Sequence, residues 1–240
     1  MSIKVENLTK TFDGRKVLDN ISFEVKTGET LAIVGFSGSG KSTVLKIISE
    51  LISADSGKVI LDTNETALVF QYSALFDSLN IFDNIAFALH ERKDLRKKYT
   101  KDEIAKIVKD KLKVVGLEGI ENKYPHELSG GMQKRVSFAR AIVTNPQIIL
   151  YDEPTAGLDP VTSTVIENYI NTLRKELGVT SIIVTHQLST INGCADRVIM
   201  FYGGKIVYEG TPKDMLISDN PYAKQFINAS VEGPMKMLTS

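Results

Sequence analysis

A glycine-rich stretch that contains a lysine and ends in serine has residue types and spacing that suggest phosphate chemistry. Residues 35–42 read Gly-Phe-Ser-Gly-Ser-Gly-Lys-Ser and fit the pattern G-x-x-x-x-G-K-[ST]. Glycines let the backbone wrap closely around an anion, with several N–H groups pointing inward. Lys41 would then reach the β- and γ-phosphates, and the Ser42 hydroxyl would bind Mg²⁺. The stretch therefore predicts a nucleoside triphosphate site; a glycine-rich turn without a ligand is the alternative.

A pair of carboxylates at the end of an apolar run is the second chemical feature. The run 147–151 is followed directly by Asp152 and Glu153. At the carboxyl end of a strand, two successive side chains can both reach the edge of the sheet. Asp152 would bind Mg²⁺ directly or through water, and Glu153 would orient or deprotonate an attacking water. Such a pair is common by chance, but beside a phosphate loop in the same sheet it predicts hydrolysis.

A Ser-Gly-Gly turn that opens a predicted helix is the third feature. Ser129, Gly130 and Gly131 come just ahead of the acidic strand. Their N–H groups and the helix dipole would make a second anion cradle, although Ser129 is also a favoured residue for an ordinary helix cap. One nucleotide does not need two cradles on one subunit. We therefore expect the second cradle to serve the nucleotide of a partner subunit.

The elements that must position these residues alternate between strand and helix patterns. Residues 30–34 form an apolar run of strand length before the phosphate loop, and residues 43–51 carry apolar side chains at helical spacing after it. Further strands are predicted within 3–34 and at 58–61, 66–70, 147–151 and 180–185, and helices at 80–143 and 160–177. This alternation predicts a mainly parallel sheet covered by helices, interrupted by a helical insert.

The composition fits a globular domain without a strong charge preference. The chain has 240 residues, of which 42% are hydrophobic, and its 29 Lys and Arg residues balance 29 Asp and Glu residues. This balance argues against nucleic acid as a partner. The single cysteine, Cys194, excludes an intramolecular disulfide and is typical of a reducing compartment. Because no signal segment or membrane-length apolar run is present, we expect any membrane attachment to come from another chain.

The motifs together resemble those of the ATP-binding cassette (ABC) ATPases over nearly the whole chain. In order, they are the loop at 35–43, Gln71, the signature at 128–135, Asp152 and Glu153, the run 156–159 and His186. The resemblance implies an α/β P-loop NTPase fold with a RecA-like, mainly parallel core, an antiparallel β subdomain and a helical subdomain at about 80–143. We divide the chain into a cassette at 1–220 and a C-terminal tail at 221–240.

The resemblance also implies a head-to-tail homodimer or heterodimer with two ATP molecules between the subunits, and we expect the homodimer. Catalysis would involve Glu153, His186, which would contact the γ-phosphate, and Gln71, which would couple Mg²⁺ and the attacking water to the helical insert. Mg²⁺ would be held by Ser42, Gln71 and Asp152. Nucleotide-binding residues would be Phe12 (stacked on adenine), Val17, Gly35, Ser37, Gly38, Ser39, Gly40, Lys41, Ser42, Thr43, Ser129, Gly130, Gly131 and Asp159.

A single cassette with a short interval between phosphate loop and signature is typical of an importer-type transporter ATPase whose permease subunits are separate chains. Residues 71–89, 220–228 and 232–234 resemble ATPases of the Mce-associated, Mla-type phospholipid transporters. That resemblance implies a permease pair, an Mce-domain substrate-binding protein and a place on the cytoplasmic face of the inner membrane. The ATPase of a polar amino-acid importer is the alternative. The interval from Gly57 to Gln71 is shorter than usual, so we expect a trimmed surface hairpin there.

Two further segments have open interpretations. Residues 91–113 hold ten Lys and Arg against five Asp and Glu, which indicates either a solvated helix face or contact with anionic lipid headgroups. In the tail, Tyr222, Phe226 and Ile227 form an apolar stripe, and Met235, Met237 and Leu238 follow a Gly-Pro break. Because such an end would be exposed unless it docked, we expect residues 221–238 to pack on the partner cassette or a regulatory subunit.

Overall fold

The computed structural model describes residues 1–236, and its centre is a six-stranded sheet in the order β5-β6-β7-β3-β8-β9. Neighbouring strands are parallel except for β8 and β9. The strands are β3 (Thr30–Val34), β5 (Thr66–Val69), β6 (Ile148–Asp152), β7 (Thr180–Val184), β8 (Arg197–Tyr202) and β9 (Lys205–Gly210). The predicted mainly parallel α/β core is therefore confirmed.

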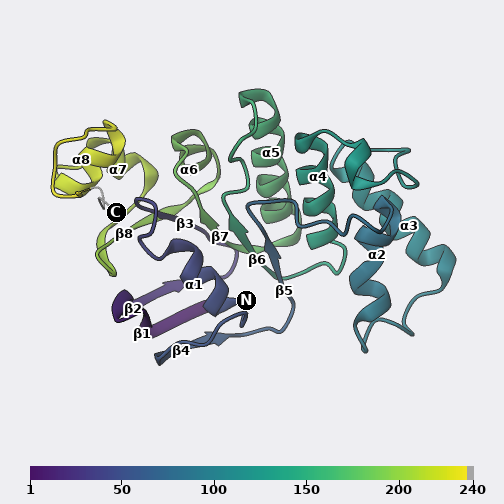
Figure 1. Ribbon diagram of the computed structural model, residues 1–240, viewed down its shortest axis with the longest axis horizontal. Helices are drawn as coiled ribbons and strands as arrows, with labels where there is room; N and C mark the ends of the chain where they lie inside the picture. Colours follow the sequence, from purple (N-terminus) through teal and green to yellow (C-terminus); the bar gives the residue numbers. More distant parts are fainter. Residues whose placement is uncertain (237–240) are drawn as a thin grey trace.

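Two layers cover this sheet, which explains why its central strands are apolar on both faces (Figure 1). One face carries α5 (Pro160–Leu177), α6 (Leu188–Cys194), α7 (Pro212–Ile217) and α8 (Pro221–Ile227), and the other carries α1 (Lys41–Ile48) and a second sheet. Side chains alternate between the layers along a strand. In β3, Leu31 and Ile33 pack in the cluster that contains α1, whereas Ala32 and Val34 pack in the cluster that contains α7 and α8.

The second sheet is antiparallel, with strand order β2-β1-β4. Its strands are β1 (Ile3–Phe12), β2 (Arg15–Val25) and β4 (Ser56–Leu61). Gly57 has φ +86°, and a Cβ there would meet the Asn7 carbonyl oxygen at 2.4 Å, so only glycine fits where β4 approaches β1. The chain then passes from β4 to β5 in the other sheet through residues 62–65 alone. Because this connection has only four residues, the interval from Gly57 to Gln71 is short.

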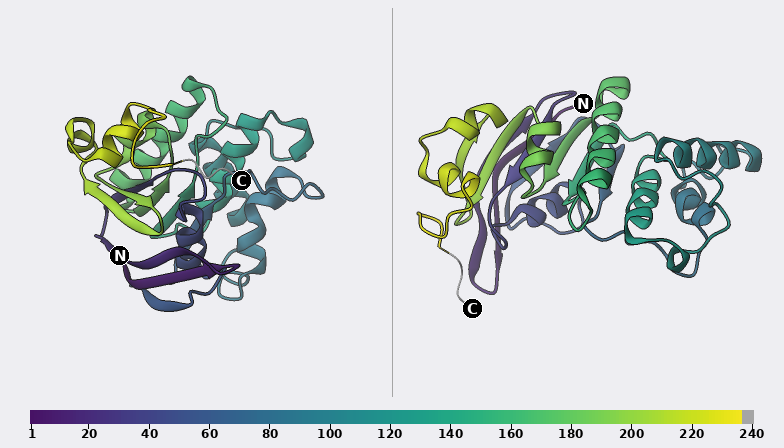
Figure 2. Two further views of the ribbon diagram at one scale, coloured as in Figure 1. Left: turned by 60° about the vertical axis from the view of Figure 1, so that its left-hand side comes forward. Right: turned by 90° about the horizontal axis from the view of Figure 1, so that it is seen from above.

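The helical insert stands at one end of the central sheet, beside β5 and β6 (Figures 1 and 2). It contains α2 (Ile81–Glu91), α3 (Lys101–Val114), the 3₁₀ turn η1 (Pro125–Glu127) and α4 (Gly130–Ala141). In α3, Ile104, Val108 and Leu112 recur at helical spacing and are at most 5% exposed, so this face of the helix is buried. Thr100 and Glu103 form a capping box at the start of α3, which fixes where that helix begins.

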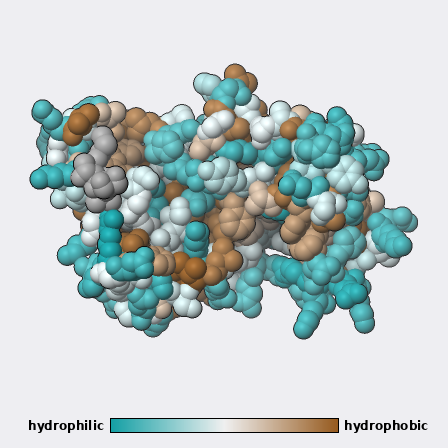
Figure 3. Space-filling model, viewed as in Figure 1, coloured by the Kyte–Doolittle hydropathy of each residue, from teal (hydrophilic) through white to brown (hydrophobic). Residues whose placement is uncertain are grey.

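The basic segment 91–113 runs from the end of α2 through most of α3, and Figure 3 shows many hydrophilic side chains at the outer edge of this insert. Most of its lysines and arginines are exposed, and the two that are partly covered have partners within the chain. Arg92 pairs with Glu65 and Asp94, and Lys111 donates to Asn145. These contacts are those of a solvated helix surface, and the alternative contact with anionic lipid stays a prediction.

The C-terminal segment packs on its own subunit as far as it is described. Met235 is 1% exposed and lies in one apolar cluster with β3, β8 and α7. The buried amide of Gln225 on α8 donates to the Met235 carbonyl (2.8 Å) and accepts from the Met235 N–H (2.7 Å). The expected docking on a partner or regulatory subunit is therefore wrong for Met235, because the chain's own core covers it. Met237 and Leu238 lie outside the described residues.

Candidate functional site

A cleft of about 810 Å³ lies where β3, β6 and β7 end, at the carboxyl edge of the parallel sheet. Its lining joins residues that are far apart in the sequence. They are Val17, Gly35, Phe36, Ser37, Gly38, Gly40, Lys41, Ser42, Thr43, Gln71, Glu153, Val184, His186, Leu188, Phe226, Ile227 and Ala229. The cleft thus unites the glycine-rich loop, one of the two strand-end carboxylates, Gln71 and His186.

The glycine-rich loop has the close-packed backbone that its glycines predict. Gly40 has φ +97°, and a Cβ there would meet the Val17 carbonyl oxygen at 2.8 Å. Gly35 has φ +144°, and a Cβ there would meet the Phe201 carbonyl oxygen at 2.4 Å. Both positions therefore require glycine for conformation as well as for space. The loop leads directly into α1, whose first three residues, 41–43, line the cleft, so its N-terminal N–H groups are available to an anion there.

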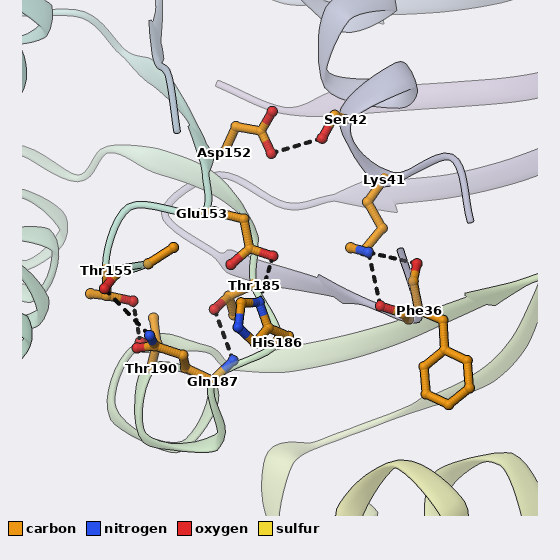
Figure 4. Close-up of polar contacts among 12 residues, drawn as sticks. Phe36, Lys41, Ser42, Asp152, Glu153, Thr155, Thr185, His186, Gln187 and Thr190 are labelled. Atoms are coloured by element: carbon orange, nitrogen blue, oxygen red, sulfur yellow. Dashed lines mark hydrogen bonds and ion pairs between the residues drawn. The ribbon is translucent and has the colours of Figure 1, made fainter. Parts of the chain in front are cut away.

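Lys41 is held inside this loop by the loop's own backbone. Its Nζ donates to the carbonyl oxygens of Gly35 (2.8 Å) and Phe36 (2.9 Å), and the residue is 9% exposed (Figure 4). Burial lowers the pKa of Lys41, while the charges of Glu153 and Asp152 oppose that shift. A phosphate in the loop would offer the ammonium group anionic oxygens in place of the two neutral carbonyls. Anionic oxygens are the stronger acceptors for an ammonium group.

Ser42 and Asp152 form the second part of the site. Ser42 Oγ, at the start of α1, donates to Asp152 Oδ1 over 2.9 Å (Figure 4). Burial raises the pKa of Asp152, and the neighbouring Glu153 charge raises it further, so a cation here would be favourable. In the described chain, residues 1–236, no cluster of three or more His, Cys, Asp or Glu side chains could hold a metal. Two oxygen donors with room for water and phosphate are, however, the ligand set that Mg²⁺ accepts.

Glu153 and His186 form the third part. Glu153 is 8% exposed, and its Oε1 lies 2.9 Å from Nδ1 of the exposed His186 (Figure 4). Its Oε2 is buried and has no hydrogen-bonding partner among residues 1–236. The Glu153 backbone is left-handed, with φ +49°, which is uncommon for a residue with a side chain. A buried carboxylate oxygen that is free to accept a proton is what activation of a water molecule needs.

Several predicted site residues lie away from this cleft. Phe12 is on β1, 44% exposed, with the Lys10 ammonium 5.3 Å from its ring centroid. Ser129 is exposed and caps α4 by accepting from the Met132 N–H (3.3 Å). Gly130 and Gly131 follow Ser129 and are the first two residues of α4. Asp159 is exposed and caps α5, and Ser39 lies within the phosphate loop with a buried hydroxyl.

Six apolar residues of the cleft were not among the predicted site residues; two are Val184 and Ala229, and the other four pack against one apolar cluster. Phe36 occupies a variable position of the glycine-rich pattern, and Leu188 begins α6. Phe226 and Ile227 come from α8, whose apolar stripe was predicted to dock but not at this cleft. All four are partly buried against the cluster that also holds Met235. The stripe was a sequence signal for Phe226 and Ile227 alone, and it does not specify the surface that these residues cover.

Comparison with known proteins finds relatives along nearly the whole chain. The family profile described as ABC transporter matches residues 18–156. Protein TRIGALACTOSYLDIACYLGLYCEROL 3, chloroplastic, of Arabidopsis thaliana is 39% identical over 264 residues, spanning 98% of this chain and 75% of its own. The probable ribonucleotide transport ATP-binding protein mkl of Mycobacterium tuberculosis is 36% identical over 252 residues, spanning 99% and 69%. The dimeric cassette MJ0796, bound to ADP and Pi, has a TM-score of 0.81 at 32% identity, covering 88% of this chain and 98% of that one.

Proposed function

This chain belongs to the ABC transporter family as an ATP-binding subunit that hydrolyses ATP, and we propose that its dimer drives a separate permease that moves phospholipids. The observation that carries the catalytic part is the convergence of Lys41, the Ser42–Asp152 pair and the Glu153–His186 pair on one cleft. The groups come from the ends of three parallel strands: Lys41 and Ser42 from the helix after β3, Asp152 and Glu153 from the end of β6, and His186 from the segment after β7.

In the proposed mechanism, the N–H groups of the glycine-rich loop and of the first turn of α1 bind the phosphates. Lys41 leaves its two carbonyl partners and donates to the β- and γ-phosphates. Ser42 and Asp152 would hold Mg²⁺, which when bound neutralises charge that develops on the phosphates. Glu153 accepts the proton of the attacking water, while His186 orients its carboxylate and contacts the γ-phosphate.

The remaining predicted residues complete the nucleotide site. Phe12 stacks on the adenine with Val17 beside it, and Gln71 completes the shell of Mg²⁺ and water. The exposure of Phe12 supports this role, because an aromatic ring on a surface strand is available for stacking. Gln71 is exposed at the edge of the cleft, where it can reach a bound phosphate or its metal.

The second cradle acts on the nucleotide of the partner subunit. Ser129 and Gly131 are at the surface end of α4 and do not line the cleft that holds Lys41, which supports a role in trans. A Cβ on Gly131 would contact Thr162 and Leu158, so the start of α4 packs against the start of α5. Asp159, which caps α5, therefore lies near the second cradle. A head-to-tail dimer related by a two-fold axis would place each cradle over the partner's cleft.

Mixing two inactive variants tests this shared site. A dimer of one Lys41→Ala and one Ser129→Ala subunit has one site with both defects and one with neither. If the cradle acts in trans, a 1:1 mixture should regain about one quarter of wild-type ATP turnover, given random exchange and independent sites. Steady-state phosphate release measures it, with each variant alone as the control. No recovery, or a dimer structure with Ser129 against its own subunit's nucleotide, would contradict the arrangement.

The lipid part of the proposal rests on two observations. Segments 71–89, 220–228 and 232–234 resemble Mla-type ATPases, and a relative spanning nearly the whole chain carries the name of a lipid, trigalactosyldiacylglycerol. The partners would then be two permease subunits and an Mce-domain protein, with the ATPase peripheral to the cytoplasmic face of the inner membrane. No helix in the described range 1–236 has the length and apolar character needed to cross a bilayer.

Purification of the intact complex through this chain tests the substrate. The expected result is co-purification of membrane permease subunits together with phospholipid, identified by mass analysis of the bound material. Lipid should exceed that found with a permease complex of an unrelated transporter purified in the same detergent. A bound amino acid or ribonucleotide in place of phospholipid would overturn the lipid assignment and leave the ATPase assignment intact.

A further inference from the structure

The loop that carries Gln71 has to be positioned by its own attachments, because Gln71 itself is exposed at the edge of the cleft. This loop, residues 70–80, joins β5 to α2 and therefore leaves the central sheet for the helical insert. Its backbone is held from two sides, by one side chain of α2 and by one side chain of α4.

The attachment to α2 is made by Asn84, which is fully buried. Its Oδ1 accepts from the Phe76 N–H (2.8 Å), and its Nδ2 donates to the carbonyl oxygens of Phe76, Leu79 and Asn80, each at 3.0 Å. These bonds fix the second half of the loop against the helix that follows it. They do not reach the half that contains Gln71.

The attachment to α4 is made by Arg140, at the opposite end of that helix from Ser129. Its Nη1 donates to the Ala74 carbonyl oxygen (2.8 Å) and its Nη2 to the Ser73 carbonyl oxygen (3.4 Å). The guanidinium carbon also lies 5.8 Å from the centroid of the Phe76 ring. One planar group thus bridges two successive carbonyls and a ring, a geometry that suits arginine and not lysine.

The backbone at Ala74 shows that this part of the loop is shaped by its surroundings. Ala74 has φ +48°, a left-handed conformation that costs energy for a residue with a Cβ and persists only where neighbouring contacts impose it. Arg140 contacts the carbonyl of this residue directly. A second hydrogen bond also attaches the loop to α4: Ser73 Oγ donates to Gln133 Oε1 over 3.2 Å.

We infer that Arg140 is a positioning residue for hydrolysis, which holds residues 73–76 on α4 and thereby keeps Gln71 at the cleft. The inference rests on the role proposed for Gln71. It also makes α4 a physical link between two sites, because the same helix carries Ser129 at its N-terminus, toward the partner's nucleotide. Arg140 touches no nucleotide-binding residue of the loop at 35–43, so it should act on turnover and leave ATP binding unaffected.

The test compares Arg140→Lys, Gln71→Ala and the double variant in the full chain. Arg140→Lys should lower kcat about tenfold, with the Kd for ATP within about twofold of wild type. The double variant should be no slower than Gln71→Ala alone, because both changes remove the same contribution. Arg92→Lys is the matched control: Arg92 also bridges two acceptors, both Glu65 oxygens (2.8 and 2.9 Å), but away from the loop, so kcat should be unchanged.

The outcomes separate this inference from the proposed function. A wild-type kcat for Gln71→Ala overturns the proposed role of Gln71, whereas a slow Gln71→Ala with a normal Arg140→Lys overturns the inference alone. Effects that multiply in the double variant would mean that Arg140 acts independently of Gln71, and an equal loss in Arg92→Lys would mean that the loss is not specific to this loop; either result overturns the inference. Should Arg140→Lys fail to fold, Phe76→Leu, which removes the ring beside the guanidinium, should lower kcat about threefold without changing Kd.

Discussion

Replacing Lys41 by alanine is expected to weaken ATP binding by about 100- to 1,000-fold. Loss of one preorganised charged donor from a phosphate site costs about 3 to 4 kcal/mol, and each 1.4 kcal/mol is tenfold in affinity. The buried ammonium group already sits within the loop at 2.8 and 2.9 Å from two carbonyl oxygens, so it needs little reorganisation to reach a phosphate. Titration with a fluorescent ATP analogue or calorimetry measures the change.

Lys46→Ala is the matched control for that prediction. Lys46 lies on the same helix α1, is exposed and does not line the cleft, so its removal should leave ATP affinity within about twofold of wild type. Thermal unfolding of both variants separates loss of binding from loss of fold. An ATP affinity for Lys41→Ala close to that of Lys46→Ala would show that the glycine-rich loop does not bind phosphate through this lysine.

Several elements of the core could be predicted from the sequence because each has a local signal, either apolar side chains at helical spacing or a continuous apolar run of strand length. The helix predicted at 160–177 is α5, and the strand predicted at 180–185 is β7 with one residue fewer. The strand predicted at 58–61 is also present, as part of β4, but nothing in its pattern indicated that it belongs to the antiparallel sheet. Sheet membership is decided by pairing with β1, about fifty residues earlier, and such pairing leaves no local signal.

The C-terminal segment shows a second kind of limit. The apolar stripe on α8 and the apolar residues after Gly233 correctly indicated that Phe226, Ile227 and Met235 are at least partly covered. They could not indicate which surface covers these residues, because an apolar stripe has the same residue types whether its own subunit or a partner covers it. The deciding contact is the pair of hydrogen bonds between the Gln225 amide and the Met235 backbone, which depends on a turn that the residue types do not specify.

At the site, the residues that could be predicted from the sequence are those that belong to a recognisable motif. The phosphate loop and the two carboxylates followed from pattern and position, whereas roles for Gln71 and His186 came from resemblance to a family. The structure places both in the cleft with Lys41 and Glu153. The attachment of the loop that carries Gln71 was not predictable. In the sequence Arg140 is an ordinary basic residue of a helix, and its contact with the Ala74 carbonyl exists only in the folded chain.

Replacing Glu153 by glutamine should reduce the rate of ATP hydrolysis by about 100- to 10,000-fold while preserving ATP binding. The amide keeps the shape of the side chain and can still accept from His186, but it is not a base. Removing the negative charge beside the phosphates also lowers repulsion with bound ATP, so affinity should be equal or higher. ATP should therefore remain bound between two subunits, and the variant should run as a dimer in size-exclusion chromatography with ATP.

Asp152→Asn serves as the comparison, because it changes the other strand-end carboxylate by the same chemistry. If Asp152 binds Mg²⁺ with Ser42, the asparagine variant should require higher Mg²⁺ concentrations for ATP-dependent dimerisation. Glu153→Gln should show the wild-type Mg²⁺ requirement, because its side chain acts on water. Wild-type hydrolysis by Glu153→Gln would remove this residue as the base. In that case the buried Oε2, which has no partner among residues 1–236, would need another explanation.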